Sequence, residues 1–89
     1  MGAGLPYIRA MDGDHILDAR GLRCPLPVLR ARKALLALPP GAVLHVLADD
    51  PVAVVDLPHF CAEAGHDLLE QADQDRAQRY IIRRGPKAR

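Results

Sequence analysis

The residues best suited to chemistry in this chain form the run Arg23-Cys24-Pro25-Leu26-Pro27, which precedes a stretch of good helix formers. The run places a thiol at the start of a predicted helix. The first backbone N–H groups of a helix have no partners within it and carry the positive end of its dipole. Both features favour the thiolate, which is the reactive form of cysteine. Because Arg20 and Arg23 add positive charge nearby, we predict that Cys24 is an exposed, reactive thiol with a lowered pKa.

Pro25 and Pro27 fall in the first turn of this predicted helix, where a missing N–H group has little cost. We expect them to hold the thiol rigidly in one arrangement, although the ordinary preference for proline at helix starts also explains them. The basic residues of this region could form a docking surface for an acidic partner, or simply a solvated helix face. They are Arg20, Arg23, Arg30, Arg32 and Lys33.

Other polar residues are assigned structural roles. Asp18 is expected to hydrogen-bond Arg20 or the backbone of the loop. Asp49 and Asp50 precede Pro51, and capping of the following helix accounts for them. Cys61 lies on the apolar stripe of that helix, so burial is predicted, with a resolving thiol for Cys24 as the alternative.

Composition limits the function further. The chain has 89 residues, 49% of them apolar, with 12 basic and 11 acidic side chains and three aromatic residues. These values fit one folded domain and offer no basic excess or aromatic platform for nucleic acid. No apolar run is long enough to span a membrane, and no secretory signal is recognised, so we expect a cytoplasmic protein. The two cysteines form no disulfide framework, and the four histidines match no ligand pattern, so neither a metal nor a cofactor is expected.

Hydrophobic periodicity predicts six elements in the order β-α-β-α-β-β. The helix that begins at Pro25 has an inward stripe of Val28, Ala31, Ala34, Leu35 and Leu38. The second helix begins after Asp50 and contains Pro58, which we expect to kink or divide it. The predicted strands are 15–19, 43–48, 67–71 and 78–83, and the predicted helices are 25–38 and 51–64.

These elements predict an α/β (α+β) two-layer sandwich, with a four-stranded mixed sheet and two helices on one face. The last two strands should form an antiparallel hairpin around a polar turn at 73–76. The strand 43–48 is almost continuously apolar, which predicts a central position. We assign residues 15–85 to the domain, 1–14 to a loosely ordered leader and 86–89 to a tail.

The segment 17–35, LDARGLRCPLPVLRARKAL, resembles the signature of the TusA/SirA family of small sulfur-carrier proteins, which is marked by a Cys-Pro-x-Pro motif. The similarity continues in ADDP, DLPHFC, GHDLL and RYIIRRG, so it covers about residues 15 to 85. Five ordered matches are far more specific than the four-residue motif alone. The position between the two prolines is often acidic in the family, whereas here it is Leu26, which puts the choice of partner in question.

The resemblance implies the same β-α-β-α-β-β sandwich and a carrier function. The motif cysteine of the family, here Cys24, accepts sulfane sulfur as a persulfide from a cysteine desulfurase or rhodanese and passes it to an acceptor protein. The expected protein is thus a sulfurtransferase that meets two protein partners, without nucleic acid or membrane, and works as a monomer.

Two other functions remain open from the sequence. One is a non-catalytic regulatory or interaction module that docks through its basic face. The other is a redox sensor that forms a disulfide between Cys24 and Cys61.

Overall fold

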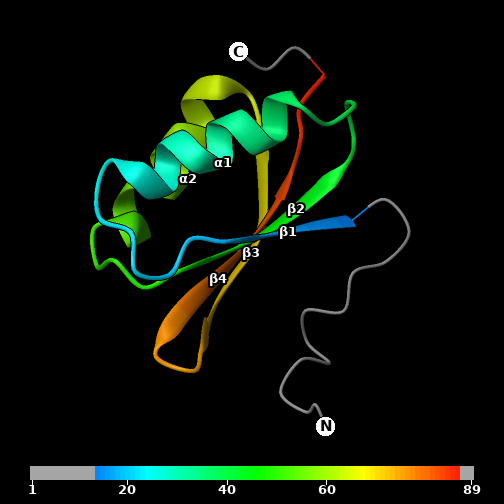
Figure 1. Cartoon of the computed structure of the whole chain (residues 1–89). Coiled ribbons are helices and arrows are strands. Elements are labelled where there is room, and N and C mark those ends of the chain that lie inside the picture. Colours follow the sequence, from blue (N-terminus) through cyan, green and yellow to red (C-terminus); the bar gives the residue numbers. More distant parts are fainter. Residues whose placement is uncertain (1–13, 87–89) are drawn as a thin grey trace, which may run out of the picture.

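The computed structural model describes residues 14–86, and Figure 1 shows their arrangement in two layers. Both helices lie over the same face of a twisted four-stranded sheet. The elements are β1 (Asp14–Asp18), α1 (Leu26–Leu36), β2 (Val43–Ala48), α2 (Ala53–Ala64), β3 (Asp67–Gln74) and β4 (Ala77–Arg83). The predicted fold class and element order are confirmed.

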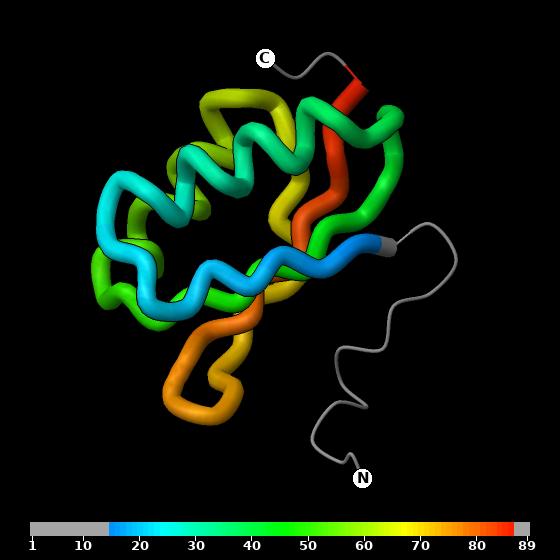
Figure 2. Tube along the Cα trace, in the orientation of Figure 1, coloured from blue at the N-terminus to red at the C-terminus, as the bar shows by residue number. Residues whose placement is uncertain are grey.

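The sheet has the strand order β1-β2-β4-β3, with β2 and β4 in the centre. Strand β1 runs parallel to β2, whereas β4 is antiparallel to both β2 and β3. Figure 2 shows the chain leaving β1, passing through α1 and returning to β2 beside it. Because β1 and β2 are parallel neighbours, their carboxyl ends lie at the same edge of the sheet, and the segments after them come together there.

The core lies between the sheet and the two helices. From α1 it takes Ala31 and Leu35, which are fully buried. Val28 and Ala34 of α1, and Leu38 just after it, pack partly buried against the core. The predicted inward stripe is thereby confirmed. The buried residues of α2 are Ala53, Leu57, Phe60, Cys61 and Ala64, and they include Cys61, for which burial was predicted.

The hairpin between β3 and β4 is tighter than predicted. The strands continue to Gln74 and resume at Ala77, so only Asp75 and Arg76 form the turn. Both have positive φ, 48° and 66°, as a two-residue type I′ turn requires. The sequence offers neither Gly nor Asn there, so the usual signal for such a turn is missing.

Helix α2 is a single element from Ala53 to Ala64 with Pro58 inside it. Of the two predicted effects of this proline, division of the helix is therefore wrong, and a kink stays a prediction. The helix ends, as predicted, at Gly65, which has a left-handed φ of 86° and donates its N–H to the Cys61 carbonyl.

The proposed leader 1–14 lies outside the described residues except for Asp14, as does most of the proposed tail 86–89. The domain limits of 15 and 85 stay a prediction. Within residues 14–86, no helix has the length and apolar character needed to cross a membrane.

Candidate functional site

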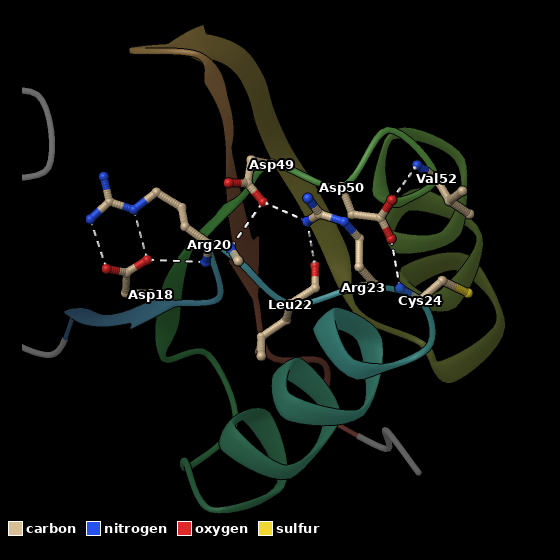
Figure 3. A network of polar contacts seen from close by, with 9 residues as sticks. Asp18, Arg20, Leu22, Arg23, Cys24, Asp49, Asp50 and Val52 are labelled. Atoms are coloured by element: carbon tan, nitrogen blue, oxygen red, sulfur yellow. Dashed lines mark hydrogen bonds and ion pairs between the residues drawn. The ribbon is translucent and has the colours of Figure 1, made fainter.

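The candidate site is built where the first two parallel strands end. Cys24 lies in the loop that follows β1, and Asp49 and Asp50 directly follow β2. Figure 3 shows these two carboxylates facing the loop, although they are separated from it by helix α1 in the sequence. The thiol is therefore positioned by contacts made across the fold.

Asp50 holds the backbone on both sides of the site. Its Oδ2 accepts a hydrogen bond from the Cys24 N–H at 2.6 Å, and its Oδ1 accepts one from the Val52 N–H at 3.2 Å. The residue is only 5% exposed, so a charged acceptor serves two backbone donors away from most solvent. One carboxylate thereby ties the cysteine loop to the start of α2.

Asp49 secures the preceding part of the loop. Its Oδ1 accepts hydrogen bonds from the Gly21 N–H at 3.0 Å and from the Arg23 guanidinium at 3.2 Å. The Gly21 N–H and, after it, the Arg23 charge lower the pKa of Asp49. The sequence analysis assigned Asp49 and Asp50 to capping of the following helix. That assignment is incomplete, because both carboxylates also hold the cysteine loop.

Asp18 closes the other side of the loop, as expected. It accepts hydrogen bonds from the Arg20 N–H at 3.1 Å and from the Arg20 guanidinium at 2.8 and 2.7 Å. These contacts, led by the guanidinium hydrogen bond, lower the pKa of Asp18 to about 2. Arg20 and Arg23 are thus each paired with an aspartate of the loop region (Figure 3).

Cys24 itself is exposed, as predicted, but its electrostatic surroundings are the reverse of the prediction. The thiol donates a hydrogen bond to Asp56 Oδ2, with a sulfur–oxygen distance of 3.3 Å. This hydrogen bond is the main cause that raises the pKa of Cys24, and the charges of Asp56 and Asp50 add to it. The prediction of a lowered pKa is therefore wrong, because the contacts of the thiol shift its pKa upwards.

The prolines explain why the helix start does not offset the carboxylate. Pro25 and Pro27 have no N–H groups, and the Leu26 N–H donates to the Arg23 carbonyl at 2.8 Å. Three of the first N–H groups of α1 are therefore absent or occupied. The motif gives the loop a defined shape, but it supplies few donors to a sulfur anion.

A groove of about 570 Å³ between α1 and α2 opens beside the thiol. Asp56, the partner of Cys24, lines it, together with Pro25, the next residue in the chain. Its apolar lining includes Val28 and Phe60, and its charged or titratable lining includes Arg32 and His59. The groove therefore adjoins the thiol through Asp56 and Pro25.

The basic residues of the predicted docking surface lie on two parts of the chain, and their docking role stays a prediction. Arg20 and Arg23 lie in the loop with their aspartates, whereas Arg30, Arg32 and Lys33 lie exposed on α1. Among residues 14–86, no acidic side chain forms an ion pair with these three α1 residues. They are therefore available to a partner.

Cys61 is buried in the core with 1% exposure, as predicted. Burial raises the pKa of its thiol to about 11. Both cysteines are free thiols. Within the described part of the chain, no cluster of three or more His, Cys, Asp or Glu side chains is arranged to hold a metal ion.

Asp56 is the site residue that the sequence analysis missed. It lies 32 positions after Cys24, in the first turn of α2. The available signal was the predicted order of elements, because a helix that follows β2 must begin at the edge where the cysteine loop ends. A carboxylate one turn into that helix could have been placed near the thiol on this ground.

The fold and the site define a class of small α+β domains that present one exposed cysteine immediately before their first helix. The family model described as Sulfurtransferase TusA matches residues 15–84, and this chain belongs to the TusA/SirA family. A crystal structure of a SirA-like protein from Desulfitobacterium hafniense is similar, with 33% sequence identity and a TM-score of 0.72. The match covers 80% of this chain and 97% of that one. The resemblance noted in the sequence is confirmed, and the family implies a general role in sulfur transfer and in relay with partner proteins.

Proposed function

We propose that this protein is a sulfur carrier that accepts sulfane sulfur on Cys24 as a persulfide and hands it to an acceptor protein. The observation that carries the proposal is an exposed cysteine, in a chain of the TusA/SirA family, whose backbone N–H is held by Asp50 and whose thiol contacts Asp56 in the lining of an open groove. A buried cysteine such as Cys61 could not meet a second protein without unfolding. Cys24 can do so as it stands.

The proposed loading step is a thiol–persulfide exchange. Cys24 loses its proton, and the thiolate attacks the terminal sulfur of a donor persulfide, R–S–S–H. A bond forms between Cys24 Sγ and that sulfur, the S–S bond of the donor breaks, and the donor leaves as R–S⁻, which then takes up a proton. The products are Cys24–S–S–H and R–SH, so one S–S bond replaces another and no oxidant is needed. Unloading repeats the exchange with an acceptor thiolate.

A cysteine desulfurase or a rhodanese is the proposed donor, because both classes form protein persulfides. The exposed residues Arg30, Arg32 and Lys33 on α1 are the proposed docking contacts, and they favour partners with an acidic face. Arg20 is a weaker candidate for docking because Asp18 already holds its guanidinium. The proposed role of Arg23 is to hold the loop through Asp49.

Intact-protein mass spectrometry tests the proposal. The protein is incubated with L-cysteine and a cysteine desulfurase without reductant, and rhodanese with thiosulfate serves as a second donor. We expect a gain of one sulfur atom that dithiothreitol removes. Cys24→Ala should gain none, whereas Cys61→Ala is the matched control and should gain one.

Loading of Cys24→Ala to the same extent as the unmodified protein would contradict the proposal. If no donor adds sulfur, the result would instead support the alternative function, a non-catalytic interaction module that docks through its basic face. The family assignment does not favour this alternative. That module predicts that Cys24→Ala leaves partner binding intact, while charge reversal at Arg30 and Lys33 abolishes it.

A further inference from the structure

The contact between Cys24 and Asp56 has a consequence for the partner. The thiol donates its hydrogen bond to a carboxylate on a different element, at 3.3 Å, at the rim of the groove. Ionisation of the thiol would exchange this bond for two negative charges side by side, which repel each other. Sulfur exchange nevertheless requires the thiolate.

The carboxylates around the thiol are not equivalent. Both oxygens of Asp50 are engaged by backbone N–H groups, and Asp49 is engaged by Gly21 and Arg23. Asp56 is the carboxylate of the described chain that contacts the sulfur. It is half-buried, so a molecule in the groove can reach it.

Among residues 14–86, no positive charge of this chain forms an ion pair with Asp56, not even Arg32 on α1, which lines the same groove. Arg23 is directed to Asp49 by an ion pair at 3.2 Å, and Arg20 is held by Asp18 at 2.7 Å. His59, which lines the same groove, lies 3.6 Å from Glu63. The charged groups that act on the thiol are therefore both acidic, Asp56 on α2 and Asp50 before it.

We propose that Asp56 keeps Cys24 protonated in the free protein and that the sulfur donor releases it by placing a cationic side chain against the Asp56 carboxylate. The inference rests on the proposed function. It identifies the partner by its chemistry, as a protein with a lysine or arginine beside its persulfide. Pairing of that cation with Asp56 removes the repulsion, the thiol proton passes to solvent, and the thiolate attacks the donor persulfide as described above.

The geometry gives this arrangement a selective effect. A small electrophile or a free persulfide brings no cation to Asp56 and meets a neutral thiol, which is a poor nucleophile. A docked donor meets the thiolate. Asp56 is thus a positioning residue that separates transfer within a complex from reaction with small molecules in solution.

Asp56→Asn tests both halves of the inference, because it keeps the shape of the side chain and removes its charge. Glu70→Gln is the matched control, since it removes one carboxylate on β3 that pairs with Arg79 and not with the thiol. Asp56 lies in the first turn of α2, where its negative charge stabilises the helix, so its removal could also lower stability. Thermal unfolding therefore verifies that both variants remain folded.

The first measurement is the rate of Cys24 alkylation by iodoacetamide between pH 6 and 10. We expect the midpoint of the profile to move to lower pH in Asp56→Asn. The thiolate fraction at pH 7 should rise about ten-fold for each pKa unit removed, and the rate should rise by less, because a less basic thiolate is a weaker nucleophile. Glu70→Gln should follow the unmodified protein. An unchanged profile in Asp56→Asn would overturn the inference.

The second measurement compares initial loading rates from two donors at pH 7, glutathione persulfide and a cysteine desulfurase with L-cysteine. Asp56→Asn should load faster from glutathione persulfide, by the factor seen in alkylation. From the desulfurase it should load no faster than the unmodified protein, because the docking cation has lost its partner. An equal gain with both donors would show that no donor cation acts on Asp56 and would overturn this half.

These outcomes are distinct from failure of the proposed function. If the desulfurase loads neither the unmodified protein nor the variant, Cys24 is not a sulfur carrier for such donors, and the inference about the donor cation fails with it. The alkylation profile still shows, independently of sulfur transfer, whether Asp56 holds the thiol proton.

Discussion

Asp50→Ala should destabilise the protein far more than Asp49→Ala, although the two carboxylates are adjacent and both contact the cysteine loop. Asp50 is 5% exposed and accepts two backbone hydrogen bonds, from Cys24 at 2.6 Å and from Val52 at 3.2 Å. Asp49 is exposed, and its contacts with the Gly21 N–H and Arg23 compete with water. Asp49 and Asp50 each accept two hydrogen bonds, so a comparison of the two variants tests whether burial of the carboxylate determines the loss of stability.

The magnitude follows from the donors that Asp50→Ala leaves without an acceptor. A hydrogen bond to a charged group contributes about 1.5–3 kcal/mol, and a helix-start contact such as that to Val52 about 1 kcal/mol. We expect a loss of about 3 kcal/mol in the free energy of unfolding. Asp50→Asn should lose a similar amount, because its amide N–H₂ would face one of the same N–H donors.

Urea unfolding followed by circular dichroism at pH 7 measures these changes, with the slope of the transition as a check on two-state behaviour. A loss below about 1 kcal/mol, the average for point substitutions in general, would refute the role given to Asp50. An equal loss in Asp49→Ala would refute the argument from burial.

Three further predictions concern the rest of the fold. Tyr80→Phe should leave the free energy of unfolding unchanged or raise it by up to about 1 kcal/mol, because the buried hydroxyl has no hydrogen-bond partner within the described residues. Urea unfolding measures this change, and a clear loss of stability would contradict the absence of a partner. Burial lowers the pKa of His66 from 6.5, so the unfolded chain binds a proton at higher pH than the folded protein does, and the free energy of unfolding should fall as the pH decreases below about 6.5. Chemical unfolding at pH 7.5 and 5.5 measures this slope, which should be smaller in His66→Gln; an equal slope would assign it to other groups. Gly85→Ala should lower the free energy of unfolding by at least about 2 kcal/mol, because its Cβ would lie 1.7 Å from the Gly65 carbonyl oxygen. Gly41→Ala is the control: its Cβ meets open space, so it should lose only about 1 kcal/mol, from its positive φ. Equal losses in urea unfolding would show that the close approach is not the cause.

Much of the fold could be predicted because its signals are local. The strand 43–48 was predicted with its observed bounds, since a nearly continuous apolar run between a Pro-Gly stop and an acidic helix start leaves few alternatives. The inward faces of both helices followed from their 3.6-residue period. The hairpin turn was predicted too long because Asp75 and Arg76 adopt left-handed conformations that neither residue type signals.

The site was predicted only in part because its electrostatics come from distant residues. The motif correctly predicted that Cys24 lies at the start of α1 and that it is exposed. Its partners Asp50 and Asp56 are 26 and 32 positions away in the sequence, and they reach the thiol through the parallel pairing of β1 with β2. A helix start predicts positive potential, but two prolines remove its donors and one carboxylate reverses the effect on the pKa.

The side-chain contacts that hold the cysteine loop come from β1, from the segment that joins β2 to α2 and, through Asp56, from α2 itself. Within residues 14–86, the outward side chains of α1, among them Arg30 and Lys33, contribute none of these contacts. Under the proposed docking role of α1, substitutions on this helix would alter which proteins are recognised while the sulfur atom keeps its place. Paralogues could then diverge in recognition by changing α1 alone, and the same face is where an engineer would redirect the proposed carrier to a new acceptor.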